Sequence, residues 1–216
     1  LDAAWMSLKI AFLTACMSLV MGILASLALV RLGRFRGKMS FAGMITAPLV
    51  MPEVITGLSL LLLFVAMEKS FGWPGGRGML TIWISHVTFS TAFVTVILSS
   101  RLKEIDRSLE EAGMDLGASP LKVFFVITIP IITPALLAAW LLAFTLSLDD
   151  LVIASFVSGP GSTTLPMKVF SSVRLGISPK INALASIIIA LVSLGVLTAG
   201  WIVRGWERKK TMGISQ

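Results

Sequence analysis

Two adjacent carboxylates stand inside a long apolar stretch of this sequence. Asp149 and Asp150 are the charged residues of the segment from 131 to 157. An ionisable side chain at the centre of a membrane helix costs at least about 2.5–3.5 kcal/mol, so it is expected to be functional or paired. Successive helical residues point about 100° apart, so both carboxylates cannot share one face. Each either lines a pathway, where a pair would suit a di- or polycation, or bonds to a neighbouring helix or a backbone amide.

A third carboxylate lies where prolines interrupt another apolar stretch. Glu53 follows Pro52, and Pro48 stands four residues before that proline. Proline removes a backbone donor and kinks a helix, and such kinks are tolerated in membrane proteins where the backbone lines a cavity. Glu53 therefore either faces a substrate path or caps a broken helix near the membrane surface.

One histidine and several aromatic residues could act on the same cation. His86 is either a proton relay or a packed, hydrogen-bonded histidine. Trp83 and Phe93 could stack on an alkylammonium group by cation–π attraction, as could Phe89 and Trp140. The alternative for the aromatic residues is packing in the core or against lipid.

The elements that must position these residues are membrane helices. The chain has 216 residues, is 56% hydrophobic with a mean hydropathy of +0.94, and carries 13% charged residues. Soluble domains carry about 25%. Five segments reach the roughly 20 residues that cross a hydrocarbon core, and only helices satisfy their own backbone there. They run from about 4 to 30, 45 to 67, 80 to 100, 131 to 157 and 183 to 203.

The basic residues predict the orientation of these spans. Clusters after the first, third and fifth spans hold 12 of the 18 Lys and Arg residues, which places those flanks and the C-terminus in the cytoplasm. The net charge of +7 thus reflects membrane flanks and not a nucleic-acid surface. The N-terminus is then outside, and with Leu1 as first residue we expect a preceding span to be missing. The single Cys16 is interpreted as a packing residue.

The segment from 101 to 130 is the long polar stretch of the chain. Apolar residues recur at helical spacing in its first half and predict one amphipathic helix: Leu102, Ile105, Leu109 and Ala112. Gly113 and Gly117 either loosen this helix or allow a close approach. Ser119 and Pro120 predict the N-cap and first residue of another helix, and Pro130 marks the entrance to the fourth span. The segment is either a solvated loop or a docking site for a soluble partner.

The spacing within this segment resembles a known signature. Glu111 and Ala112, then Gly117, then Ile-Thr-Ile-Pro at 127–130 resemble the coupling loop of the permease subunits of bacterial ABC importers. Gly113 stands where that family usually has a second Ala. Blocks at 46–57, 146–156, 164–166 and 178–183 further resemble the spermidine/putrescine importer permeases.

The resemblance implies an all-α integral membrane fold, the type I ABC importer transmembrane domain, as a single domain over 1–216. Six spans are expected in the full-length protein, five of them here. The implied setting is the bacterial inner membrane, with a paralogous permease as heterodimer partner, an ABC ATPase dimer and a periplasmic polyamine-binding protein. The implied ATPase-coupling residues are Glu111, Ala112, Gly113, Gly117, Ser119 and Pro130. The expected substrate pathway contains Asp149, Asp150, Glu53, Trp83 and Phe93.

The energy source is expected to lie on another subunit. No Gly-x-x-x-x-Gly-Lys-Ser/Thr phosphate loop occurs in the sequence, so we expect a transport subunit without cofactor, with ATP and Mg²⁺ on the partner ATPase. Three alternatives remain: a permease for another organic cation or an amino acid, a proton-driven secondary transporter using Asp149, Asp150 and His86, and a membrane scaffold.

Overall fold

The computed structural model describes residues 2–33 and 35–174, together with positions 183, 186, 190 and 193. Residues 1–168 form one compact unit and residues 169–216 another. The arrangement below is that of the first unit. Most of the predicted fifth span, 183–203, lies outside the described residues.

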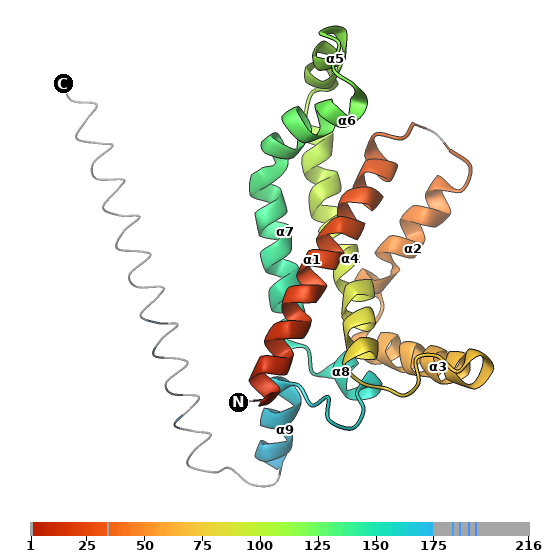
Figure 1. Ribbon diagram of the computed structural model, residues 1–216, viewed down its shortest axis with the longest axis vertical. Helices are drawn as coiled ribbons and strands as arrows, with labels where there is room; N and C mark the ends of the chain where they lie inside the picture. The colour runs from red at the N-terminus through yellow and green to blue at the C-terminus, as the bar shows by residue number, and fades with distance from the viewer. Residues whose placement is uncertain are drawn as a thin grey trace, which may run out of the picture. The chain divides into compact units, whose positions relative to one another are not determined.

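Three long helices lie side by side in this unit (Figure 1). They are α1 (Asp2–Val30), α4 (Met79–Glu104) and α7 (Ile129–Asp149). Shorter elements join them: α2 (Lys38–Val50), α3 (Glu53–Phe71), α5 (Arg107–Asp115), α6 (Pro120–Val123), the π-helix η1 (Phe124–Thr128), α8 (Val152–Val157) and α9 (Leu165–Arg174). In the described part of the chain, four stretches are long and apolar enough to cross a membrane: α1, α3, α4 and Pro120–Asp149.

Small side chains let α1 and α4 pack closely. The buried face of α1 includes Ala11, Ala15, Ser18 and Gly22. Membrane helices associate through such residues because lipid gives no hydrophobic drive between helices. A Cβ on Gly22 would lie 2.4 Å from Val94 Cγ1 and 3.3 Å from the backbone nitrogen of Thr95. The distance between these two helices thus depends on the absence of a side chain at position 22.

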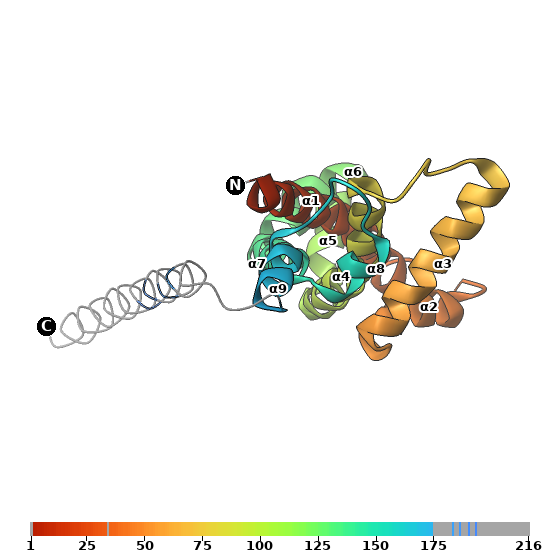
Figure 2. The ribbon, with the colours of Figure 1, turned by 90° about the horizontal axis from the view of Figure 1, so that it is seen from below.

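The prediction of one continuous span from 45 to 67 is wrong. Helix α2 ends at Val50, Met51 is extended (φ −79°, ψ 136°) and α3 begins at Glu53. Pro52 explains the break, because a proline disfavours helical geometry at the preceding residue. In the views of Figures 1 and 2, α3 runs crosswise to α4 and α7.

The predicted span from 131 to 157 also differs in the structure. Its helix starts earlier, since α6, η1 and α7 follow one another without a gap from Pro120, and it stops at Asp149. The π-helical turn directly precedes Pro130, which has no N–H for the normal helical bond, and π-turns absorb such interruptions. Asp150 is extended (φ −63°, ψ 125°), and the short helix α8 follows.

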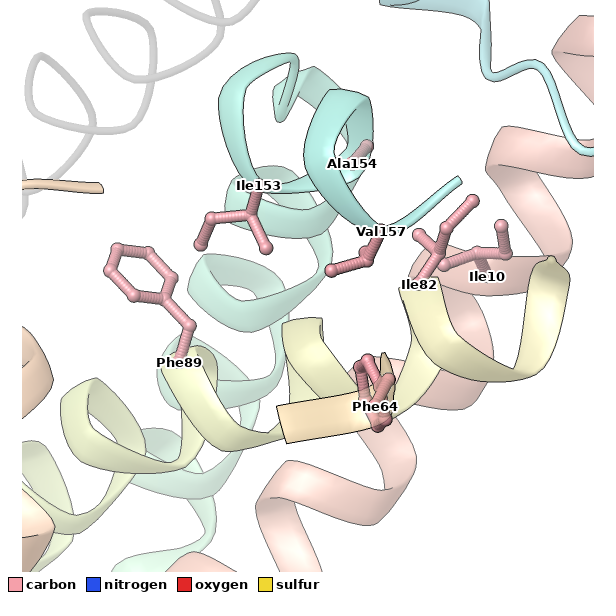
Figure 3. Close-up of a cluster of buried hydrophobic side chains, with 7 residues drawn as sticks. All are labelled: Ile10, Phe64, Ile82, Phe89, Ile153, Ala154 and Val157. Carbon is pink, nitrogen blue, oxygen red and sulfur yellow. The ribbon is translucent and has the colours of Figure 1, made fainter. Parts of the chain in front are cut away.

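A buried apolar cluster fixes α8 in the unit. It joins residues of four helices, as Figure 3 shows: Ile10, Phe64, Ile82, Phe89, Ile153, Ala154 and Val157. Gly57 brings α3 close as well, because a Cβ there would lie 2.8 Å from Phe156 Cδ2. The two segments that follow helix breaks, α3 and α8, are therefore packed against each other.

The packing of α1 on α4 generates a prediction with a matched control. Gly22→Ala should destabilise the protein because the new methyl group overlaps Val94, and overpacking of this kind costs about 1–3 kcal/mol. Gly43→Ala, in α2, has open space around the new Cβ and should be neutral or stabilising, since Ala favours a helix by about 1 kcal/mol over Gly. Thermal unfolding in detergent measures both. Equal midpoints for the two variants would contradict the packing argument.

Candidate functional site

The polar segment between α4 and α7 contains a break that the sequence analysis did not predict. The expected continuous helix through Leu102, Ile105, Leu109 and Ala112 is wrong, because α4 ends at Glu104 and Ile105 is extended. Asp106 then caps α5, its Oδ1 accepting a hydrogen bond of 3.0 Å from the Ser108 N–H. An aspartate that bonds its own downstream backbone competes with helix continuation.

The same cap stabilises the ionised form of the Asp106 carboxyl group. The hydrogen bond from the Ser108 backbone N–H, followed by one from its hydroxyl, lowers the pKa of the Asp106 carboxyl below its ordinary value. The carboxylate is therefore ionised at neutral pH, where it complements the positive N-terminal end of α5.

Gly117 ends α5 in a left-handed turn. Its φ is +87°, its N–H donates to the Met114 carbonyl (2.8 Å), and the Ala118 N–H donates to the Gly113 carbonyl (3.1 Å). This pair of bonds is the Schellman motif, which favours glycine at the left-handed position. Gly117 thus terminates the helix and does not loosen it.

Gly113 serves close packing. A Cβ on this residue would lie 2.7 Å from Ile127 Cδ1 and 3.2 Å from Val123 Cγ2. Helix α5 therefore rests directly on α6 and η1. The helix start predicted at Ser119 and Pro120 is confirmed, since the Ser119 Oγ accepts a bond of 3.4 Å from the Lys122 N–H.

The outer face of this segment is apolar and unusually exposed. Leu116 is 90% exposed and Leu121 72%, and Leu109, Met114 and Phe125 are also exposed. Glu111 and Ala112 belong to the same exposed surface, whereas Gly113 is buried. We call these exposed residues the coupling face: Leu109, Glu111, Ala112, Met114, Leu116, Leu121 and Phe125. Four of them, Glu111, Met114, Leu121 and Phe125, also line the groove described below.

Glu110 is largely buried and connects α5 to the long helices. Its Oε1 accepts from Arg31 Nε at 3.2 Å, lies 3.0 Å from Arg31 Nη2, and accepts from Thr128 Oγ1 at 3.0 Å. Arg107 Nη2 also donates to the Val30 carbonyl at 2.9 Å, at the last residue of α1. The Arg31 and Glu110 side chains are 16% and 17% exposed. Movement of α5 would therefore be passed on to the end of α1 and to η1.

This network was missed by the sequence analysis. Arg31 belongs to the basic cluster after the first span and Glu110 directly precedes Glu111, but no pairing between them was predicted. A groove of about 870 Å³ lies beside the network, lined mainly by apolar side chains of α1, α6 and η1, among them Val20, Leu24 and Phe124.

The break between α7 and α8 holds the second group of candidate residues. Asp150 accepts from the Ile153 N–H (3.3 Å) and the Ala154 N–H (2.7 Å), so it caps α8. Its Oδ2 also lies 3.1 Å from His86 Nε2, and His86 Nδ1 lies 2.7 Å from Ser147 Oγ. The side chains of His86 and Asp150 are 2% and 9% exposed. His86 is thus a packed, hydrogen-bonded histidine.

The neighbouring carboxylate is in a different situation. Asp149 is exposed, and its carboxylate makes no hydrogen bond or ion pair with the residues that the structure describes. Glu53 is likewise exposed, in the first turn of α3, one turn before the Gly57 that contacts α8. The structure therefore separates the two aspartates by surroundings: Asp150 is bonded from three sides and Asp149 is open.

Two of the aromatic candidates on α4, Phe89 and Phe93, pack against each other. Phe93 is half-buried and packs against Phe89, with ring centroids 5.2 Å apart. Trp83 is half-buried, and its indole N–H is buried without a partner among the described residues. Cys16 accepts a bond from Trp140 Nε1 at 3.5 Å, in keeping with a packing role. Over the same described residues, no cluster of His, Cys, Asp and Glu could hold a metal ion.

Known proteins resemble this chain along its whole length. It is 61% identical to the putrescine transport system permease protein PotI of Escherichia coli K12 over 216 residues, which span 77% of that protein. It is 40% identical to the spermidine/putrescine transport system permease protein PotC of the same organism over 211 residues, covering 98% of this chain and 77% of that protein.

Solved structures agree on the fold at lower identity. A methionine ABC transporter in inward-facing conformations superposes with a TM-score of 0.69 at 17% identity, covering 94% of both chains. An amino acid ABC transporter gives 0.59 at 18% identity, over 89% of this chain and 86% of that one. The family model of the binding-protein-dependent transport system inner membrane component matches residues 18–211. The chain belongs to this family of inner-membrane transport components.

Proposed function

We propose that this chain is a permease subunit of an ATP-driven importer that moves putrescine or a related polyamine across the inner membrane. The observation that carries the proposal is the α5–α6 segment, with an outward coupling face and an inward ionic link to α1 and η1. The polyamine assignment is supported by the 61% identity to a putrescine permease.

The partners follow from the same reasoning. A paralogous permease forms the second half of the pathway, and a binding protein delivers the substrate from outside. An ABC ATPase dimer binds ATP and Mg²⁺ and receives the coupling face. Exposed Leu116 and Leu121 supply the apolar contact, and Glu111, Ala112, Ser119 and the Gly113-dependent packing set the shape of the docked segment.

Coupling proceeds as a rigid-body movement. Closure of the ATPase dimer displaces α5, which has a defined start at Asp106 and a defined end at Gly117. Gly113 keeps α5 seated on η1, and the Arg31–Glu110 pair passes the movement to α1. The helix that continues through Pro130 then moves as part of α7. Packed elements of this kind switch between discrete arrangements.

The substrate is recognised as a cation. Alkyl amines have pKa values near 10, like lysine, so polyamines carry several positive charges at neutral pH. Asp149 supplies an open carboxylate at a helix break, and Glu53 supplies another at the start of α3. Trp83 and Phe93 remain candidates for contact with the methylene chain or the ammonium groups.

The test is uptake of labelled putrescine into proteoliposomes that hold the permease pair, the ATPase and the binding protein. Uptake should require ATP and persist when the proton gradient is collapsed. Gly117→Leu should uncouple ATP hydrolysis from uptake, because a left-handed φ costs a side chain about 1–2 kcal/mol and distorts the end of α5.

Gly72→Leu is the matched control. Gly72 also ends a helix at positive φ (+68°) with open space around it, but in the loop between α3 and α4. That variant should retain uptake. Uptake that is normal in the Gly117 variant, or abolished by collapse of the proton gradient, would reject the coupling assignment.

The ionic link gives a second prediction. Glu110→Gln should lower uptake per ATP hydrolysed, because it leaves the partly buried Arg31 without its charged partner. Glu104→Gln is the control, because it removes a surface ion pair with Arg101. The Arg101 and Glu104 side chains are 43% and 63% exposed, and such pairs contribute about 0–1 kcal/mol. Measured coupling ratios should differ between the two variants. A Glu110 variant that couples as well as the Glu104 variant would show that the link transmits nothing.

The two aspartates give a third prediction. Asp150→Ala should lower the thermal stability of the complex, since loss of an N-cap costs about 0.5–2 kcal/mol and leaves His86 Nε2 without its partner. Asp149→Ala should leave stability unchanged and raise the KM for putrescine. Melting curves and uptake kinetics on the same preparations distinguish the roles. A melting point lowered by Asp149→Ala as much as by Asp150→Ala would argue that both carboxylates are structural.

A further inference from the structure

A buried hydrogen-bond network of three polar side chains connects α4 to the break between α7 and α8. It runs from Ser147 through His86 to Asp150, with separations of 2.7 Å and 3.1 Å. His86 is 2% exposed and Ser147 6%. This network includes neither the residues of the coupling face nor the exposed carboxylates Asp149 and Glu53.

The direction of its hydrogen bonds follows from the acceptor at one end. Two backbone N–H groups already donate to the Asp150 carboxyl oxygens, as at other helix N-caps. The tautomer with the hydrogen on His86 Nε2 fits these contacts, because that N–H can donate to Asp150 Oδ2. In the neutral ring Nδ1 is then an acceptor, and the Ser147 hydroxyl donates to it.

The arrangement restricts Asp150 and, through it, the residue before it. Three donors from two elements hold one carboxylate: the imidazole of α4 and the first free N–H groups of α8. Asp150 has extended backbone geometry, and Asp149 is the last residue of α7. One peptide bond joins Asp149 to Asp150, so holding Asp150 in place limits how far the end of α7, and Asp149 with it, can move.

We propose that His86 is a positioning residue for substrate uptake, which holds Asp150 at the helix break and thereby directs Asp149 toward the cation. Ser147 orients the His86 ring. This inference rests on the proposed function for the identity of the cation, but not for the geometry it assigns.

Two conservative variants separate this role from simple packing. His86→Gln can place an amide N–H near the position of Nε2, so it can still donate to Asp150. His86→Asn reaches only the position of Nδ1, so it keeps the Ser147 side and loses Asp150. The third variant, His86→Ala, loses both contacts.

Putrescine uptake by the assembled transporter is the first readout. The KM should rise about tenfold in His86→Asn and His86→Ala, the order of effect of one lost hydrogen bond to a charged group, and should stay near the wild-type value in His86→Gln. Ser90→Ala is the control, because it removes a buried α4 hydroxyl that has no partner among the described residues. Equal KM values for the Asn and Gln variants would overturn the proposal.

A double variant keeps the test valid if single variants assemble poorly. In an Asp150→Ala background, His86→Ala should add no further rise in KM, because the two residues act on one contact. Independent, multiplying effects would overturn the proposal.

A second readout does not depend on which substrate the transporter carries. Asp149→Cys, in a Cys16→Ser background, reports the direction of position 149 through its rate of reaction with a small cationic thiol reagent. His86→Asn should change this rate and His86→Gln should not. An unchanged rate in both would overturn the positioning role, whereas absence of polyamine uptake with the expected labelling would reject only the polyamine assignment.

Discussion

In an apolar environment a backbone N–H or C=O without a partner is costly, and this requirement governs the helix breaks at Met51 and Asp150. The break before α3 uses proline, which has no N–H to satisfy. The break before α8 uses a carboxylate, which accepts the N–H groups of Ile153 and Ala154. The two solutions differ in consequence, because proline brings no acceptor whereas Asp150 brings a carboxyl group that also contacts the buried His86. The exposed neighbour Asp149 takes no part in these contacts, so it is a separate functional candidate.

The segment between α4 and α7 follows the same rule. Its helix ends are completed by Asp106, Gly117 and Ser119, so that a short polar stretch has a defined shape. In the proposed coupling role this defined shape matters, because a loop without fixed ends would absorb the movement that it should pass on. The Arg31–Glu110–Thr128 contacts then connect this shape to two of the long helices.

The sequence predicted the elements that depend on local chemistry. The Ser119–Pro120 helix start is a local signal and was found. Apolar length identified the stretches that became α1 and α4. The break at Asp150 was missed because hydropathy reports composition and not backbone geometry. At Pro52 the sequence indicated a kinked or broken helix, but not where its two parts end and begin. Ile105 fits the apolar repeat although the helix breaks at this residue. Its side chain is buried in the folded chain, as it would be in a continuous amphipathic helix.

Long-range partners could not be read from the sequence. Arg31 and Glu110 are 79 residues apart, and His86 and Asp150 are 64 apart. Nothing in their spacing states that they meet. The sequence left open which aspartate is structural, and the structure distinguishes them by their surroundings, because only a folded chain shows which carboxylate has donors around it.

The different surroundings of Glu110, which pairs with Arg31, and Glu111, which is exposed, limit how the length of this segment can vary. Between the Asp106 cap and the Gly117 turn, one inserted or deleted residue would rotate the following part of α5 by about 100°. A deletion before Glu111 would bring it toward Arg31, and either change would put a residue with a side chain where Gly113 fits against Ile127. Surface loops usually tolerate insertions. This polar segment should instead be conserved in length across relatives, even where individual residues on its outer surface change.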